Sequence, residues 1–197
     1  MAIELADKEG LEAVSMRRIA RDLRAGAMSL YHYFDSRDEL LELMADEVAR
    51  EMLVPSLSAD WREALEAIAH HSRAMFLRHP WLLATLHEQP VVTPNLLRHI
   101  EQSAQSVSRL RDVAPEVLTG IVTAVDDYTI GFTMRELGGA GRGSPHRFEE
   151  PEVRYLIESG EFPLIAQFLA GGGRPLPTSF ETGLGWLLDG FAAQIPS

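Results

Sequence analysis

The chain of 197 residues is 46% hydrophobic and 24% charged, a composition typical of a globular protein and not of a disordered one. Eighteen Lys and Arg residues stand against 29 Asp and Glu residues, and the resulting net charge of −11 argues, taken alone, against a nucleic-acid binder. The absence of cysteine excludes disulfides, thiol catalysis, Cys-ligated zinc and thiol-based redox sensing.

The N-terminal segment, residues 1–10, is acidic and amphipathic, and it lacks the basic and apolar regions of a signal peptide. No apolar run approaches the ~20 residues that a transmembrane helix needs. We therefore expect a cytoplasmic protein with no membrane partner.

Apolar residues recur at helical spacing along most of the chain, and no segment alternates with the period of a strand, so we predict an all-α fold. Capping boxes begin at Ser36, Asp60 and Thr178, and Pro94, Pro115 and Pro151 suit the first turn of a helix. The expected helices are 2–9, 16–23, 27–34, 37–53, 61–78, 81–87, 94–112, 115–137, 150–158, 163–169 and 179–194.

Two breaks interrupt this pattern. The segment 55–58 marks a soft boundary, which predicts a domain over residues 1–54 and a second over 55–197. The glycine-rich segment 138–145 lacks the lysine of a phosphate-binding loop and follows a helix instead of a strand. We interpret it as a solvated loop.

The segment 15–37 predicts a helix-turn-helix. Ile19, Ala20 and Leu23 form the apolar face of one short helix, and Leu30 and Phe34 form that of the next. Only three residues separate the two helices, as in motifs whose second helix enters the major groove of DNA.

The charge of this segment differs from that of the whole chain. Five arginines, at positions 17, 18, 21, 24 and 37, stand against Asp22 and Asp35, a local charge of +3. The remainder of the chain then carries −14 and would repel DNA everywhere except at this face. We therefore expect low non-specific affinity and strong salt sensitivity.

The same residues resemble the tetracycline-repressor (TetR) family. The strong match covers about residues 1–50, and the weaker one is similar to tetracycline-repressor-type C-terminal domains. The matching segments are 10–20, 30–34 and 36–41, then 79–81, 94–96 and 180–190. The resemblance implies a three-helix DNA-binding domain followed by a larger helical domain for ligand binding and dimerisation.

The resemblance also implies roles for individual residues on double-stranded DNA. Tyr31 and Arg37 would contact phosphates, Ser15 would cap the second helix and contact the backbone, and Arg17 would read a base. The exposed face of the recognition helix would consist of Ala27, Met28, Ser29 and His32. For Tyr31 a surface aromatic, and for Ser15 simple capping, are the alternatives.

The sequence departs from the family at three places. Arg24 stands where the family usually has glycine, because the turn favours positive φ, and it would add a phosphate contact at the expense of backbone strain. Gly26 stands where the family often has a serine cap. The first helix is also shorter than in most relatives.

The resemblance implies two functional regions in the C-terminal part, a dimer interface and a ligand cavity. The helices 115–137 and 179–194 are implied to form a four-helix interface in a homodimer. The family also has a ligand cavity within 61–137, where core packing is the alternative role for each candidate lining residue. The candidates are His71, Met75, Trp81, Leu86, His87, Ile100, Tyr128 and Phe132.

His87 aligns with a histidine that ligates the drug-bound metal in the tetracycline repressor. However, no asparagine lies between Asp60 and Arg78, where that repressor has one that contacts the drug. Tetracycline is therefore disfavoured, and we expect neither a metal nor a cofactor. The adjacent pair Asp126 and Asp127 falls on successive helix faces, which favours ion pairing over joint chelation.

The leading hypothesis is a repressor, not an enzyme, that binds a palindromic operator as a homodimer and leaves it when an unidentified small molecule binds. An all-helical enzyme or ligand carrier without DNA binding is the alternative, although the chain lacks Glu-x-x-His, His-Glu-x-x-His and G-x-S-x-G motifs. A third interpretation, based on Arg24, Gly26 and the short first helix, is a relative that has lost DNA binding.

Overall fold

The computed structural model describes residues 1–85, 92–138, 149–171 and 179–195, and within these ranges it is helical with no strand. The predicted all-α fold is confirmed. The N-terminal elements are α1 (Ala2–Glu9), η1 (Leu11–Ala13), α2 (Met16–Asp22), α3 (Ala27–Leu30), α4 (Arg37–Ala49) and η2 (Arg50–Met52). The C-terminal elements are α5 (Trp61–Arg78), α6 (Pro80–Thr85), α7 (Pro94–Val107), α8 (Pro115–Leu137), α9 (Pro151–Glu158), α10 (Pro163–Ala170) and α11 (Phe180–Ala192).

Side-chain caps explain where the helices begin. Ser36 and Asp60 each accept a hydrogen bond from the backbone N–H three residues ahead, at 3.1 and 3.0 Å, as predicted. The cap of α11 is Ser179 and not the predicted Thr178, and its hydroxyl accepts from Thr182 at 3.1 Å. The three helix-starting prolines lie at the first turns of α7, α8 and α9.

The predicted helices 27–34, 37–53 and 94–112 end four or five residues earlier than expected, and the second divides into α4 and the 3-10 helix η2. The recognition helix α3 stops at Leu30 instead of residue 34, and a hydrogen-bonded turn carries the chain onward. Ser36 caps α4 with an extended backbone, φ −150°, so the chain leaves the helical conformation before this residue. Helix α7 stops at Val107 instead of 112, and Asp112 adopts a positive φ of 57°.

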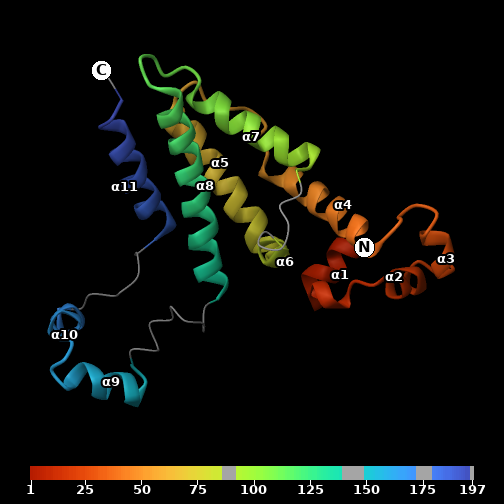
Figure 1. Cartoon of the computed structure of the whole chain (residues 1–197), viewed down its shortest axis with the longest axis horizontal. Coiled ribbons are helices and arrows are strands. Elements are labelled where there is room, and N and C mark those ends of the chain that lie inside the picture. The colour runs from red at the N-terminus through yellow and green to blue at the C-terminus, as the bar shows by residue number, and fades with distance from the viewer. Residues whose placement is uncertain (86–91, 139–148, 172–178, 196–197) are drawn as a thin grey trace.

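Figure 1 shows how the helices are arranged. Helices α1–α3 form a lobe at one end, α4 leads from that lobe into the body, and α5, α7, α8 and α11 make up the body. One buried cluster joins α1–α4 to Met75, Phe76 and the residues 81–83. A second cluster lies between α5, α7, α8 and α11. The segments on the two sides of the boundary predicted at residue 54 thus share a core.

Helices α8 and α11 approach each other closely at Gly183. The hydroxyl of Tyr128 donates to the carbonyl of Phe180 at 2.9 Å, and the rings of Tyr128, Phe132 and Phe180 pack with centroids 5.3–5.8 Å apart. A Cβ at Gly183 would lie 2.2 Å from the Tyr128 hydroxyl oxygen. Glycine is therefore needed at this contact.

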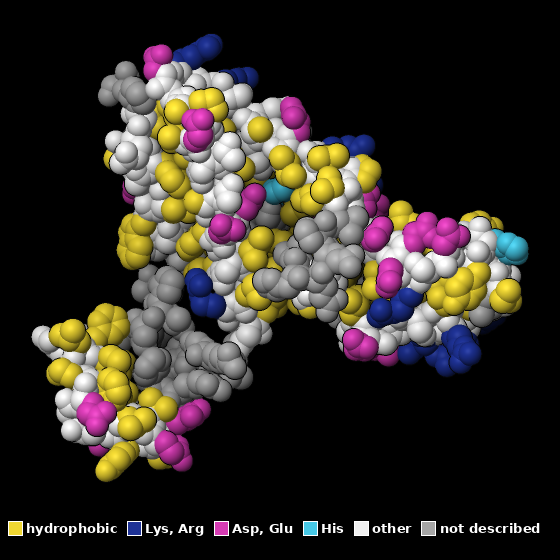
Figure 2. Space-filling model, in the orientation of Figure 1, with side chains coloured by type: hydrophobic (Ala, Val, Ile, Leu, Met, Phe, Trp, Pro, Cys, Tyr) yellow, Lys and Arg dark blue, Asp and Glu magenta, His cyan; other side chains and the backbone are white. Residues whose placement is uncertain are grey.

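Helices α9 and α10 pack on each other and contain no buried residue. Their apolar side chains Tyr155, Leu164 and Phe168 are largely exposed, and Figure 2 shows hydrophobic atoms over this hairpin. None of the helices in the four described ranges combines the length and the hydropathy needed to cross a membrane.

Candidate DNA-binding surface and ligand cavity

The pair α2 and α3 forms the predicted helix-turn-helix. Ser15 caps α2, and its hydroxyl accepts from the backbone N–H of Arg18 at 3.3 Å. Met16, Ile19 and Ala20 of α2 are buried, and Leu30 is the buried residue of α3. This packing turns Met28 and Ser29 of α3 toward the surface.

The turn between these helices depends on an arginine in an unusual conformation. Arg24 has φ 56°, in the left-handed region that favours glycine, so the turn has the positive φ expected at this position. Gly26 caps α3 with an extended backbone and no side-chain hydrogen bond. A Cβ there would lie 3.7 Å from the Ser29 hydroxyl, so the serine common in the family would fit.

The residues predicted to face the DNA bases lie around α3. Ala27 begins the helix, Met28 is 76% exposed, and Ser29 and His32 are also exposed. Tyr31 is half exposed, which leaves its hydroxyl accessible to a phosphate. Tyr33, which the sequence analysis did not single out, is 77% exposed on the same turn. Its position next to Tyr31 and His32 was the available signal.

The arginines of this region have different partners. Arg18 forms hydrogen bonds of 2.9–3.1 Å with Glu9 and of 2.9 Å with Asp22. These bonds hold the pKa values of both carboxyls below their ordinary range and raise the pKa of the guanidinium. The charge of Arg18 is therefore balanced within the protein.

Three other arginines remain for DNA. Arg17 and Arg24 are exposed and have no hydrogen-bond or ion-pair partner among the described residues, and Arg21 only reaches Asp22, at 3.5 Å. Figure 2 shows Lys and Arg side chains gathered along the lower edge of the lobe that α1–α3 form. The positive charge of the segment 15–37 is thus carried at the surface by these three side chains.

Arg37 has an intramolecular role in addition to the one predicted. Its Nε donates to the carbonyl of Val14 at 2.8 Å and its Nη2 donates to that of Leu11 at 3.0 Å. The half-buried side chain thereby ties the start of α4 to the segment that precedes α2. Contact with a phosphate would fall to Nη1 and the helix N-terminus, and it stays a prediction.

A cavity of about 540 Å³ lies between α4 and the C-terminal helices, within the size range of small-molecule sites. One face of α4 contributes residues at helical spacing, from Asp38 to Ala49, and Met52 of η2 extends it. The remaining lining residues are Ser72, Met75, Phe76, Leu82, Thr85, Thr93, Leu96, His99, Ile100, Asp126, Thr129 and Ile130.

Two polar groups in this lining are unsatisfied. Ser72 and His99 are more than nine-tenths buried, and neither Ser72 Oγ nor His99 Nδ1 has a hydrogen-bond partner within the described part of the chain. The other ring nitrogen of His99, Nε2, lies 3.6 Å from a carboxylate oxygen of Asp126. A buried polar group without a partner costs free energy, and both atoms are shielded from the open cavity as well as from solvent.

Some of the residues predicted to contact a ligand line the cavity, and others do not. Met75 and Ile100 line the cavity. His71, Trp81, Tyr128 and Phe132 do not: Trp81 packs in the N-terminal core, and the two other aromatic residues pack between α8 and α11. Leu86 and His87 lie outside the described residues.

Sequence reasoning missed several lining residues. The α4 face, with Leu41, Ala45 and Ala49 four residues apart, had an apolar spacing that indicates burial but not against what. His99 and Ser72 had no distinguishing neighbours in the sequence, and Asp126 was interpreted only as an ion-pairing residue.

Comparisons with known proteins agree with this architecture. Residues 1–44 match the family described as bacterial regulatory proteins, tetR family, and residues 54–195 match the tetracyclin repressor-like C-terminal domain. The HTH-type transcriptional repressor DrrR1 of Streptomyces coeruleorubidus is 34% identical over 98% of this chain and 75% of its own length.

The chain belongs to the TetR family. An HTH-type transcriptional regulator of Saccharopolyspora erythraea is 30% identical over 98% of the chain and 81% of its own length. The crystal structure of the TetR-family protein ActR of Streptomyces coelicolor in complex with actinorhodin is similar, with a TM-score of 0.79 and 27% identity over 100% of this chain and 95% of that one. The chain is a DNA-binding transcriptional repressor of this family.

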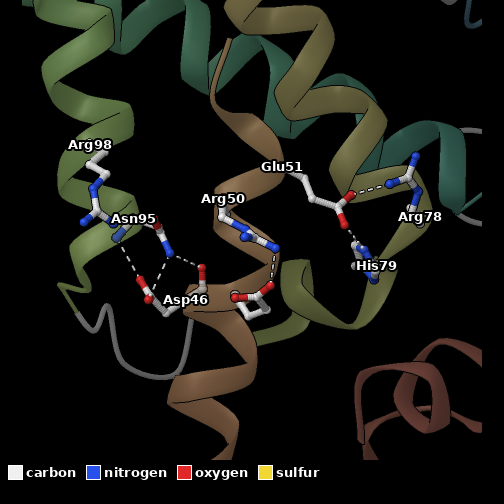
Figure 3. A network of polar contacts seen from close by, with 8 residues as sticks. Asp46, Arg50, Glu51, Arg78, His79, Asn95 and Arg98 are labelled. Atoms are coloured by element: carbon white, nitrogen blue, oxygen red, sulfur yellow. Dashed lines mark hydrogen bonds and ion pairs between the residues drawn. The ribbon is translucent and has the colours of Figure 1, made fainter. Parts of the chain in front are cut away.

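In this TetR-family chain, α4 is fastened to the C-terminal helices at two points (Figure 3). Asp46 accepts from the backbone N–H of Asn95 at 2.8 Å and from its side-chain amide at 3.0 Å, at the N-terminus of α7. Glu51 in η2 pairs with Arg78 and lies 3.4 Å from Nε2 of His79. The helix that lines the cavity is therefore held at its second half, beyond the DNA-binding lobe.

Helix α6 makes a second connection to this lobe. Asp7 of α1 accepts from the indole N–H of Trp81 and bonds to Nδ1 of His79, both at 2.7 Å. On the same helix, Leu82 and Thr85 line the cavity. A molecule in the cavity would thus contact two elements, α4 and α6, that also hold the DNA-binding helices.

Proposed function

We propose that the chain acts as a homodimer that represses transcription from a near-palindromic operator and is released when its effector occupies the cavity between α4, α5, α7 and α8. In the DNA-bound form, Tyr31 and Arg24 contact phosphates, Arg17 reads a base, and Met28 and Ser29 lie in the major groove. The observation that carries this proposal is the position of α4, which follows the recognition helix in the chain and forms one wall of the cavity.

A route from cavity to DNA follows from this geometry. An effector shifts the equilibrium only by its different affinity for the two conformations, so it must contact something that moves. The wall from Asp38 to Met52 and the α6 residues Leu82 and Thr85 are such contacts. Because Arg37 and Asp7 join these elements to the lobe, a shift of α4 or α6 changes the position of α3.

Dimerisation supports this mechanism, because two recognition helices must reach successive major grooves about 34 Å apart. Helices α8 and α11 lie side by side at the outer side of the body (Figure 1). Trp186 on α11 is 67% exposed, and a Cβ at Gly120 or Gly190 would meet open space. An exposed tryptophan beside small residues is typical of a surface that a partner helix covers.

Electrophoretic mobility shift with the DNA upstream of the chain's own gene tests DNA binding. The wild type should give a specific shift that Arg17→Ala and Tyr31→Phe weaken, because each removes one contact per protomer. Arg109→Ala is the matched control, since this exposed arginine lies in the turn after α7. Absence of a specific shift at low salt would contradict the proposal.

Sedimentation velocity tests the dimer. Trp186→Arg should shift the protein toward monomer and weaken operator binding, because a charge would then be buried at the interface. Leu97→Arg, at an exposed position of α7, should leave a dimer. A monomeric wild type that still binds the operator would refute the dimer part of the proposal.

A further inference from the structure

Among the described residues that line the cavity, the Asp and Glu side chains have no Lys or Arg beside them. Asp38, Glu42 and Asp126 line it, and no Lys or Arg is among its described lining residues. His99, beside Asp126, is the one histidine in that lining. The rest of the wall is made mainly of apolar side chains from α4, α5, α6, α7 and α8.

Two of the carboxylates in the lining are exposed and available to a ligand. Asp38 and Glu42 lie one turn apart on α4, are exposed, and have no hydrogen-bond or ion-pair partner in the described ranges. The arginines near this region pair elsewhere: Arg50 with Glu47, Arg78 with Glu51. Arg98 donates to the side chain of Asn95 at 2.6 Å.

The third carboxylate lies against α7. The side chain of Asp126 is 34% exposed and faces His99 Nε2 at 3.6 Å, a distance longer than a hydrogen bond. It therefore retains most of its capacity to accept hydrogen bonds. Asp127, the next residue, is exposed and does not line the cavity.

Two residues of the cavity wall also carry a buried polar atom without a hydrogen-bond partner among the described residues. Ser72 Oγ and His99 Nδ1 lack partners, and both residues belong to the lining. Ser103 Oγ, one turn beyond His99, is also unsatisfied but does not line the cavity. Because both atoms are shielded from solvent, they do not face the open cavity, and a ligand would reach either of them only if the side chain of Ser72 or His99 changed its rotamer.

We propose that the effector is an apolar organic cation, an amine or onium group on an aromatic or aliphatic frame, whose charge is recognised by Asp126 and by the α4 pair Asp38 and Glu42. This inference rests on the proposed function, since it names the ligand class of the same cavity. The apolar wall takes the frame, and the carboxylates supply the opposite charge at short range in a partly desolvated site.

The same wall discriminates against anions. An anionic molecule of equal size would bury the same apolar surface but would face three carboxylates, with no Lys or Arg among the lining residues that the structure describes. Selectivity between ions of equal shape and opposite charge is therefore the property that distinguishes this cavity from a merely hydrophobic one.

Isothermal titration calorimetry with tetraphenylphosphonium and tetraphenylborate tests the inference, because these ions have nearly the same shape and opposite charge. A planar pair, 9-aminoacridine and acridine-9-carboxylate, repeats the comparison for flat molecules. We expect the cation of at least one pair to bind on the order of tenfold more tightly than its anion. Equal binding, preference for the anions, or binding of none of the four would overturn the inference.

Single substitutions test which carboxylates are responsible for cation binding. Asp126→Asn should weaken cation binding roughly tenfold and leave anion binding unchanged or stronger, whereas Asp127→Asn on the same helix should change neither. Glu42→Gln, at an exposed position, serves where Asp126→Asn fails to fold, and should weaken cation binding severalfold. Cation binding that is the same in wild type, Asp126→Asn and Glu42→Gln would overturn the assignment.

The mobility-shift experiment separates this inference from the proposed function. Failure of cation selectivity with an intact operator complex leaves the repressor and excludes only the ligand class. Failure of operator binding refutes the proposed function whatever the calorimetry gives.

Discussion

Arg24 combines an unfavourable backbone conformation with a useful charge. Its φ of 56° costs a non-glycine residue about 1–2 kcal/mol, while its exposed guanidinium lies beside the recognition helix. The turn would be more stable with glycine, but the surface would lose one of three arginines that lack a strong internal partner. Stability and DNA affinity therefore oppose each other at this residue.

Arg24→Gly should raise the free energy of unfolding by about 1 kcal/mol and Tm by about 3 °C. It should also weaken operator binding, because a phosphate contact is lost. Arg24→Ala is the control: it loses the same contact but keeps a Cβ at positive φ. Differential scanning calorimetry should give a higher Tm for Arg24→Gly than for Arg24→Ala. An equal Tm for the two variants would refute the strain argument.

Arg18 should control the titration of two carboxyls. Its hydrogen bonds lower the pKa values of Glu9 and Asp22, so both contribute stability above their ordinary pKa values. That contribution is lost as pH falls through the lowered values, in the acid range below about pH 4. In Arg18→Ala both pKa values should rise, as NMR titration of the carboxyl carbons would show; unchanged values would contradict the pairing.

At the scale of helices, the contact between α8 and α11 depends on the absence of one side chain. A Cβ at Gly183 would lie 2.2 Å from the Tyr128 hydroxyl oxygen and 2.9 Å from its ring carbon Cζ. The tyrosine cannot rotate away without breaking its bond to the Phe180 carbonyl and its ring packing.

Gly183→Ala should lower the free energy of unfolding by about 1–3 kcal/mol, measured by chemical denaturation. Gly185→Ala is the matched control on the same helix, where the nearest contact of a Cβ is 4.0 Å away, and it should be neutral or slightly stabilising. Adding Tyr128→Phe to Gly183→Ala should recover part of the loss. Equal stability of the two alanine variants would refute close approach at Gly183.

The helices themselves were largely predictable from local sequence. Ser36, Asp60 and the prolines mark helix starts, because capping is a property of neighbouring residues. The end of α3 was not predictable from Leu30 and Phe34. Their helical spacing of apolar residues continues through the hydrogen-bonded turn that follows the helix.

The cavity was predictable only in part. Met75 and Ile100 line it, whereas Tyr128 and Phe132 have the same apolar character but face α11. Helical periodicity shows which side of a helix is buried, but not which neighbouring helix or space that side meets. His99 shows the same limit, because its unsatisfied Nδ1 is a property of the assembled fold.

For the whole molecule, the net charge of −11 and the few available arginines determine how salt affects DNA binding. Of the three such arginines in each protomer, Arg17 is proposed to read a base and two remain for phosphates, so in a dimer the plot of log affinity against log salt should have a slope of roughly −4. Arg24→Ala should make this slope shallower by about 2, and Arg109→Ala should leave it unchanged. Fluorescence anisotropy over a salt series measures the slope; a slope unaffected by Arg24→Ala would exclude the phosphate contact.

The core that α1–α4 share with Met75, Phe76 and the residues 81–83 limits the modular exchange of domains. A chimera that grafts residues 1–54 onto the effector domain of another regulator would separate the N-terminal part of this cluster from Met75, Phe76 and the residues 81–83, and would leave Asp7 without Trp81. A graft that also carries over residues 75–83 keeps these contacts. The part of this repressor that can be exchanged as a unit is therefore discontinuous in sequence. A biosensor built from it should carry residues 1–54 together with residues 75–83.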